Sequence, residues 1–404
     1  MRIGRTLPPA AAPIDLGNLL SGIRGILAGQ QELERFRAEL KEHFGVKHCF
    51  LVSSGKAAFT LILLALKDLS PDRNEVLIPA FTCYSVPSSI VRAGLRVRLC
   101  DLHPDRLDFD FAQLSALLPG DLSPGLLAVV PTHLFGFPAD VANVRKLVKD
   151  PAVTIVEDAA QAMGEEVPGG LAGTVSDVSF FSLGRGKAFS VVEGGVILTN
   201  RDNLAERLDA SISRLPRYGL LRLLGLLFKA VALTVLMHPW MFWLPRSLPF
   251  LSLGETLFEP HFPILRMSSF QAGLAGNWRP KLDALRRVRQ RHVNRWRSIL
   301  AACKTRGPHI PGDQVPGLLR YPLRISDGGK REALLRESAA DGMGIMPVYP
   351  ASLDAIPELH GTLGNSTFPV AASYARELVT LPTHGYVMEE DMTRIRGLVS
   401  RVLG

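Results

Sequence analysis

The sequence predicts an α/β protein, in which a large, doubly wound, mostly parallel sheet domain is followed by a smaller α+β domain. Between about residues 31 and 199, short apolar runs alternate with helix-like segments. The runs are β-branched or aromatic and are bounded by Gly, Pro or Asp, as strands are. Such alternation is typical of a parallel sheet with helices on both faces. From about Gly317 to Gly404 the pattern is mixed and is punctuated by prolines such as Pro347, Pro350 and Pro382.

Seven runs are the expected strands, and in chain order they read CFLVSS, EVLIPA, RVRLCDL, LLAVVPTHL, VTIVEDA, DVSFFSL and GGVILTN. Ligands of doubly wound sheets bind beyond the carboxyl ends of the strands. Chemistry is therefore expected at the residues that follow the runs, namely Ser54-Gly55, Thr82-Cys83-Tyr84, His133, Asp158 and the loop from Ser182 to Lys187.

The chain is expected to divide into three parts. Residues 1–30 form an N-terminal arm, whose first dozen residues we expect to be disordered. Residues 31–267 form the large domain, and residues 268–404 form a linking helix and the small C-terminal domain. An apolar and basic stretch at about 217–262 interrupts the large domain.

The composition is that of a globular protein, with 47% apolar and 21% charged residues among 404. Four scattered cysteines form no CxxC pair and have no histidine at metal-ligand spacing, so neither a disulfide framework nor a metal site is expected. The N-terminus lacks the continuous apolar core of a signal peptide. These features favour a cytoplasmic protein.

A net charge of +8 raises the question of a polyanionic partner. The densest cluster, from Leu285 to Arg297, carries apolar residues near helical spacing, which predicts that most of its arginines lie on the solvated face of one helix. No zinc finger, RNP-type strand motif or helix-turn-helix accompanies the cluster, so a nucleic-acid partner is not expected.

Three features at the predicted strand ends suggest one kind of chemistry. SSGKAAF, from Ser53, brings small residues and free amides to a helix start, where anions bind. Asp158 closes a buried strand, where a carboxylate can hold a proton on a ring nitrogen. Lys187 lies on a short loop between two strands, from which an amine can form a Schiff base. An anchored phosphate, a protonated pyridine and a lysine Schiff base are what pyridoxal phosphate (PLP) requires.

Each feature has a simpler interpretation when it is taken alone. Ser54-Gly55 can be an ordinary helix start, Asp158 can cap a helix beginning at Ala159, and Lys187 can be a surface lysine. Their joint occurrence, in this order and at these spacings, favours the PLP site.

The chain resembles the DegT/DnrJ/EryC1/StrS family of PLP-dependent sugar aminotransferases. The matching motifs cover most of residues 35 to 300 and read SSGKAAF, IPAFTCYS, VVPTHLFGFPADV, VEDAAQAMG, GTVSDVSFFSLGRGK, EGGVILTN and SSFQAGLAGNWRPKLDAL. The resemblance implies PLP fold type I and transfer of an amino group from an amino acid, with glutamate as the expected donor. The implied acceptor is a keto-sugar, nucleotide- or lipid-linked, in polysaccharide or glycolipid biosynthesis. A homodimer is also implied, because the family builds its sites across a two-fold interface.

The resemblance further implies roles for matching residues around the cofactor ring. Lys187 would carry the Schiff base and move the proton between cofactor and substrate carbons, as anchor and general base. Asp158 would pair with the pyridinium nitrogen, and Gln161 would lie near the phenolic oxygen of the ring. A lysine rather than a histidine at position 187 favours transamination over sugar dehydration.

The implied phosphate site consists of Ser54, the backbone amides of Gly55 and Lys56, and the Ser182 hydroxyl. The position that stacks on the ring departs from the family pattern, which usually has an aromatic residue after Thr82. This chain has Cys83 and then Tyr84 there, and either can cover the ring. Ile264 stands where the family has the asparagine of its N-x-R motif.

The stretch 219–251 is the least expected part of the chain. Its longest run without a charged residue or histidine, Ala230 to Met237, is far shorter than the roughly 20 residues that a bilayer span needs. Leucines and aromatic residues mixed with arginine and lysine suit a segment lying at the inner face of a membrane, which would fit a lipid-linked acceptor. Packing in a homodimer interface or against the sheet is the alternative.

Two other functions stay open at this point. One is a PLP-dependent transaminase of a non-sugar carbonyl, which Cys83 and Ile264 make admissible. The other is a non-catalytic PLP-binding protein, against which Lys187, Asp158 and Ser182 argue.

Overall fold

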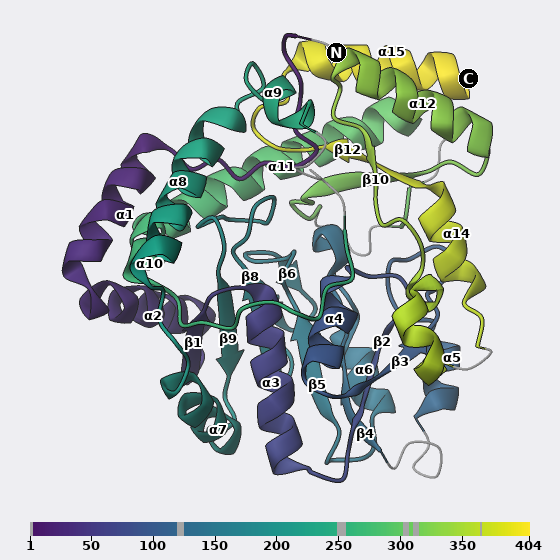
Figure 1. Cartoon of the computed structure of the whole chain (residues 1–404). Helices are drawn as coiled ribbons and strands as arrows, with labels where there is room; N and C mark the ends of the chain where they lie inside the picture. The colour runs from purple at the N-terminus through teal and green to yellow at the C-terminus, as the bar shows by residue number, and fades with distance from the viewer. Residues whose placement is uncertain (1–2, 119–124, 249–255, 302–306, 310–314, 364–365) are drawn as a thin grey trace.

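A seven-stranded sheet forms the centre of the computed structural model (Figure 1), which describes residues 3–118, 125–248, 256–301, 307–309, 315–363 and 366–404. The strand order is β1-β9-β8-β5-β4-β2-β3. The strands are β1 (His48–Val52), β2 (Glu75–Pro79), β3 (Arg96–Cys100), β4 (Leu126–Val129), β5 (Thr154–Asp158), β8 (Val178–Ser182) and β9 (Gly195–Thr199). Six of them lie within the predicted runs, and β1 begins at His48, one residue before its run. The predicted α/β class with a mostly parallel sheet is confirmed.

Within this sheet β9 runs antiparallel to both of its neighbours, β1 and β8, while the other described pairings are parallel. Every residue of β4, β5 and β9 is buried, because helices cover both faces. Because β2, β3, β4, β5 and β8 are parallel, their carboxyl ends lie at one edge of the sheet. At that edge β8 and β9 are joined by the loop that carries Lys187.

Helices flank the sheet on both faces. One of them, α3 (Gly55–Leu69), is apolar on nearly all sides because it lies between strands β8 and β9 and the helices α4 and α7. The remaining elements of this part of the chain are α1 (Leu16–Ala28), α2 (Gln30–Phe44), α4 (Ser85–Arg92), α5 (Phe111–Leu117), η2 (Leu134–Gly136), α6 (Val141–Leu147), β6 (Glu166–Val167), β7 (Gly170–Leu171), α7 (Asp202–Ser213), α8 (Leu220–Leu236), α9 (Trp243–Arg246) and α10 (Ser269–Leu274).

A second, three-stranded antiparallel sheet with the order β10-β12-β11 forms the C-terminal part. The long helix α11 (Trp278–Ala301) leads to it (Figure 1). Its elements are β10 (Arg320–Arg324), α12 (Gly328–Asp341), β11 (Met346–Pro347), η4 (Leu353–Ala355), η5 (Pro357–Leu359), α13 (His360–Leu363), α14 (Pro369–Glu377), β12 (Leu378–Pro382) and α15 (Glu389–Leu403). We keep the domain boundaries at 1–30, 31–267 and 268–404 as a proposal, which the course of α11 supports.

The arginine-rich segment 285–297 lies within α11, as its periodicity predicts. Trp296 and Ile299 are buried, and Arg287, Arg291, Arg295 and Arg297 are exposed. Arg289 departs from the prediction, because it is only 2% exposed. Its guanidinium donates to backbone carbonyls, which satisfies the buried charge.

The N-terminal arm is ordered over most of the stretch expected to be disordered, so that expectation is wrong for residues 3–12. Leu7 is buried, and its amide donates to the Gly342 carbonyl at 2.8 Å. Arg5 forms an ion pair with Asp391 at 2.6 Å. Both contacts are with residues more than 300 positions away, which no local pattern in the arm reveals.

The stretch at 217–262 contains α8 and α9, while its residues 249–255 lie outside the described part. Helix α8 lies beside α1 (Figure 1). None of the described helices has both the length and the apolarity that crossing a bilayer requires.

Candidate functional site

The first helical turn after β1 and the end of β8 approach each other closely. A Cβ atom on Gly55 would lie 2.8 Å from the Cβ of Ser182, which is too close for two carbons. Ser54 caps α3, since its Oγ accepts the Ala57 amide at 3.1 Å. The Gly55 and Lys56 amides, at the N-terminus of the helix, have no acceptor within it. Amides and the Ser182 hydroxyl thus form a small cradle suited to an anion.

The Lys56 side chain is directed elsewhere. Its Nζ donates to Glu259 at 3.1 Å and lies 4.4 Å from the centroid of the Phe262 ring. The backbone amide of Lys56, rather than its ammonium group, is therefore the group available to a phosphate.

Asp158 lies at the carboxyl end of β5 and is buried. Its Oδ1 accepts the Ala160 amide at 3.0 Å, and no hydrogen bond from a described residue reaches Oδ2. Burial raises the pKa of this carboxyl group, while the Ala160 hydrogen bond and the nearby charge of Lys187 act in the opposite direction. A turn rather than a helix follows at Ala159, so the helix-cap interpretation is wrong.

Lys187 is half-buried in the loop between β8 and β9. Arg289 of α11 supports this loop, because it donates to the carbonyls of Ala188 at 2.9 Å and of Lys187 at 3.3 Å, and to Ala11 of the arm at 3.4 Å. Val192 in the same loop has φ 76°, a conformation that is strained for a β-branched residue. Such strain persists where the surroundings fix the backbone, as they do at functional sites.

Gln161 follows Asp158 by three residues and reaches toward the C-terminal part. Its Oε1 accepts the Phe135 amide at 3.3 Å, and its Nε2 is 3.5 Å from the hydroxyl of Tyr349. Tyr349 is buried, which raises the pKa of its hydroxyl well above the usual value. Sequence reasoning missed Tyr349, and the only local signal is an aromatic residue between Pro347 and Pro350.

The two residues proposed for ring stacking have different surroundings. The Tyr84 hydroxyl donates to the carbonyl of Ala351 at 3.0 Å and accepts its amide at 3.1 Å. Cys83 is half-buried, and its Sγ accepts the Ser85 hydroxyl at 2.9 Å. Tyr84 therefore joins the two parts of the chain, and Cys83 is the freer of the two to contact a ring.

His133, which was expected among the residues that carry chemistry, has a structural role. It is fully buried, its Nε2 lies 2.7 Å from Glu157 Oε1, and its Nδ1 accepts the Ala139 amide at 2.9 Å. Because Nδ1 accepts, the ring N–H is on Nε2 and donates to the carboxylate. Both hydrogen-bonding positions are occupied, so His133 holds the loop after β4 against β5.

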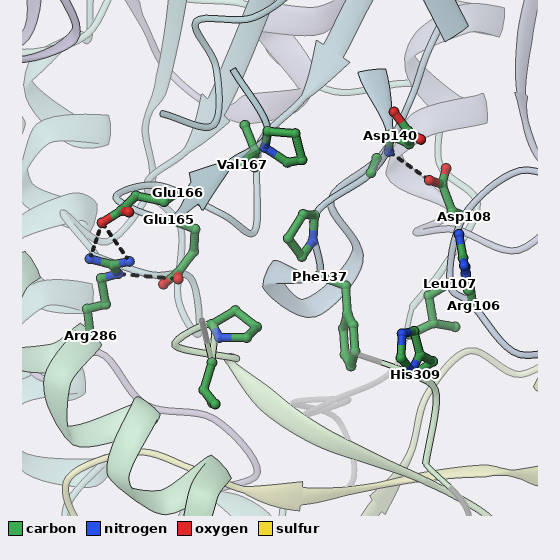
Figure 2. A pocket seen from close by; sticks show the side chains of 15 residues that line it. Arg106, Leu107, Asp108, Phe137, Asp140, Glu165, Glu166, Val167, Arg286 and His309 are labelled. Carbon is green, nitrogen blue, oxygen red and sulfur yellow. Dashed lines mark hydrogen bonds and ion pairs between the residues drawn. The ribbon is translucent and has the colours of Figure 1, made fainter. Parts of the chain in front are cut away.

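The structure also has a cavity of about 520 Å³ (Figure 2). It is lined by residues after β3, by the loop after η2 and by Arg286 of α11, which pairs with Glu165 and Glu166 at 3.3 and 3.4 Å. None of the predicted site residues lines it.

The residues at the sheet edge fit PLP. The glycine cradle suits its phosphate, and the buried Asp158 carboxylate has an oxygen to which no described group donates a hydrogen bond. The buried hydroxyl of Thr82 also lacks a partner among the described residues. Buried polar groups without partners are rare in folded proteins and suggest a bound group.

A protein-family model described as the DegT/DnrJ/EryC1/StrS aminotransferase family matches residues 22–233 and 257–400. The chain is 26% identical over 377 residues to a GDP-perosamine synthase of Caulobacter vibrioides, covering 91% of this chain and 89% of the relative. It is 24% identical over 393 residues to a UDP-N-acetyl-3-dehydro-alpha-D-glucosamine 3-aminotransferase of Acidithiobacillus ferrooxidans, covering 96% and 92%.

Among solved structures, an aminotransferase of Helicobacter pylori involved in the biosynthesis of pseudoaminic acid superposes with a TM-score of 0.79. The two chains are 17% identical, and 99% of each is covered. This likeness supports the fold, and the near full-length relatives support transamination of a sugar.

Proposed function

This chain belongs to the DegT/DnrJ/EryC1/StrS aminotransferase family and is a PLP-dependent aminotransferase, and we propose that it moves the amino group of glutamate to a keto-sugar carried on a nucleotide or a lipid. The observation that carries the proposal is the grouping of Lys187, the buried Asp158 and the Gly55–Ser182 cradle at one sheet edge. Relatives named for nucleotide-sugar substrates support a sugar over another carbonyl.

Each of these residues has a distinct task in the proposal. When bound, PLP supplies a ring that withdraws electrons from the carbon where the amino group is exchanged. The Lys187 amine would hold the cofactor and then carry the proton between the reacting carbons. Asp158 would keep a proton on the ring nitrogen, because a buried carboxylate favours a neighbouring cation. The Gly55 and Lys56 amides and the Ser182 hydroxyl would bind the phosphate.

Other residues would contact the ring from its sides. Gln161 would lie near the phenolic oxygen, with Tyr349 holding its amide, and Cys83 would cover one face of the ring. Tyr84 would act through its bonds to Ala351, which join the two parts of the chain around the site.

Visible absorbance of the purified protein tests this function. We expect a Schiff-base band that glutamate converts to the pyridoxamine form. The Lys187→Ala variant should be unable to regenerate the original band, because it lacks the amine. A wild-type protein that binds no PLP would contradict the enzyme assignment at this site. One that binds PLP but responds to no amino donor would favour the non-catalytic alternative.

An exposed apolar face formed by α1 and α8 supports a peripheral membrane contact. Leu27 of α1 is 85% exposed, and Leu221 and Phe228 of α8 are 83% and 75% exposed. Arg24 and Arg222 lie on the same two helices, and cations of this kind are attracted to anionic lipid. A second copy of the chain is the alternative occupant, and we propose a homodimer in either case.

Flotation with vesicles of phosphatidylglycerol separates the two occupants. Membrane contact predicts that Leu221→Ser with Phe228→Ser abolishes flotation, while the control Leu64→Ser on α3 floats like the wild type. The alternative predicts that the wild-type protein does not float and that the double variant no longer dimerises in light scattering. That result would assign the face to a second copy of the chain.

A further inference from the structure

Three arginines line a small pocket beside the Lys187 loop. The pocket has a volume of about 220 Å³, and its lining includes Arg185, Arg246 and Arg320. Gly186, next to Lys187, also lines it. The arginines come from three separate elements, namely the loop after β8, helix α9 and strand β10. The fold, rather than a local sequence motif, therefore brings the three charges together.

The positive charge of this pocket is uncompensated within the described part of the chain. No aspartate or glutamate is among the described lining residues, and no described residue forms an ion pair or side-chain hydrogen bond with any of the three guanidinium groups. Loss of hydration lowers the pKa of each, and for Arg320 the charge of Arg185 adds to this. Arginine stays charged at neutral pH nonetheless, so Arg185 and Arg320 repel each other, and Arg246 adds a third positive charge to the same pocket.

The pocket adjoins the proposed PLP site but is distinct from its phosphate cradle. The positive charge of Arg320 acts to lower the pKa of the Tyr349 hydroxyl, which contacts Gln161. Gly55 and Ser182, which form the cradle, do not line the pocket. An anion held by the arginines would thus lie beside the Lys187 loop and apart from the phosphate cradle.

Part of the pocket lies in a segment that the family model does not match. Met237, Phe242 and Arg246 fall between residues 233 and 257, which the family model does not match. Met237 and Phe242 are apolar and line the pocket together with Arg246, so the pocket offers both positive charge and hydrophobic surface.

We propose that Arg185, Arg246 and Arg320 bind the diphosphate of the sugar acceptor. Guanidinium groups match phosphate oxygens in bidentate geometry. Three cations suit the multiple negative charges of a diphosphate better than a single carboxylate. In an activated sugar the diphosphate is attached to C1, only a ring away from a keto carbon. The proposal rests on the proposed sugar aminotransferase function and names the group by which that acceptor is recognised.

Calorimetric titration of the PLP-loaded protein with inorganic pyrophosphate tests the pocket. We expect the Kd to rise about ten- to a hundred-fold in Arg185→Gln, in Arg246→Gln and in Arg320→Gln, because each loses hydrogen bonds to a charged group. Arg222→Gln, an exposed arginine of α8 outside the pocket, is the control and should bind like the wild type. Thermal unfolding of each variant identifies any that fails to fold, and the remaining variants then decide.

Two diphosphates identify the carrier. Tighter binding of uridine diphosphate than of farnesyl diphosphate indicates a nucleotide, and the reverse order indicates a lipid; either result supports the proposal if the arginine variants weaken it. Unchanged Kd values in all three variants, or an equal loss in Arg222→Gln, would overturn it.

The glutamate half-reaction, followed by absorbance in the same variants, separates this proposal from the general function. Loss of that half-reaction with unchanged pyrophosphate binding would show that the arginines hold the donor carboxylate, and would overturn the diphosphate assignment. A wild-type protein that ignores glutamate but binds pyrophosphate through the arginines would refute the transaminase function alone.

Discussion

Replacing Gly55 by alanine tests the proposed phosphate cradle directly. The new Cβ would lie 2.8 Å from the Cβ of Ser182, 3.1 Å from its Oγ and 3.3 Å from its Cα. Favourable carbon contacts are about 3.5–4.0 Å long, so helix α3 and the end of β8 must separate by roughly 0.7 Å. Neither neighbour is the flexible end of a long side chain, and the movement must therefore involve backbone.

The expected stability change has two opposing parts. Overpacking of a tight contact costs about 1–3 kcal/mol, while alanine gains up to about 1 kcal/mol over glycine in a helix. The gain is smaller at the first helical position, so we expect a net loss of about 1–2 kcal/mol in urea unfolding. PLP should bind about ten- to a hundred-fold more weakly, because the Ser182 hydroxyl and the helix amides no longer converge on one phosphate.

Two further variants make this result specific. Gly225→Ala, in α8 where a Cβ would have no neighbour within 4 Å, should keep wild-type PLP affinity and lose no stability. Gly55→Ala with Ser182→Gly removes the two nearest atoms and should recover stability but not PLP affinity, because the hydroxyl is lost. Wild-type stability and PLP affinity in Gly55→Ala alone would refute the cradle.

Three other outcomes follow from buried polar groups. His384 is buried and donates to the Pro8 carbonyl at 2.7 Å, and burial lowers the pKa of its ring to about 4. Because the unfolded chain binds this proton near pH 6.5, the contribution of neutral His384 to folding stability is complete above about pH 6.5 and is lost as the pH falls to 4. In urea unfolding over that range the wild type should lose up to about 3 kcal/mol relative to His384→Gln, and parallel curves would contradict this. His133→Ala should cost roughly 1.5–3 kcal/mol, because Glu157 loses a buried donor; an unchanged urea midpoint would show that another group replaces the donor. Arg289→Met should reduce turnover more than PLP content, because the carbonyls of the Lys187 loop lose their donor; equal losses would indicate general unfolding.

The strands could be predicted because their surroundings leave a clear pattern in the sequence. Runs such as VTIVEDA are apolar on both faces, since helices cover both sides of the sheet. The strand ends then identify the edge at which Asp158 and Lys187 meet. The direction of β9 has no such signal, because a buried antiparallel strand and a buried parallel strand have the same composition.

Residues that reach the site from distant parts of the chain could not be predicted. Tyr349 lies 188 positions after Gln161, which it contacts, and Arg320 has no local motif. Arg289 belongs to a basic run that resembles a solvated helix face, and only the packing of α11 against the arm and the Lys187 loop buries it. The same long-range contacts order the arm, whose sequence alone predicts disorder.

The residues proposed for cofactor binding and those proposed for acceptor recognition lie in different parts of the chain. The cradle, Asp158 and Lys187 all lie in stretches that the family model matches, and their surroundings are fixed by strands and by α3. Arg246 lies in the unmatched stretch, on the short helix α9 that follows α8 in the chain. A change at Met237, Phe242 or Arg246 is therefore expected to alter the charge and the apolar surface of the proposed acceptor pocket without moving the residues proposed to hold PLP. In this arrangement the stretch between residues 233 and 257 would select the acceptor, while the sheet edge would carry out the amino transfer common to the family.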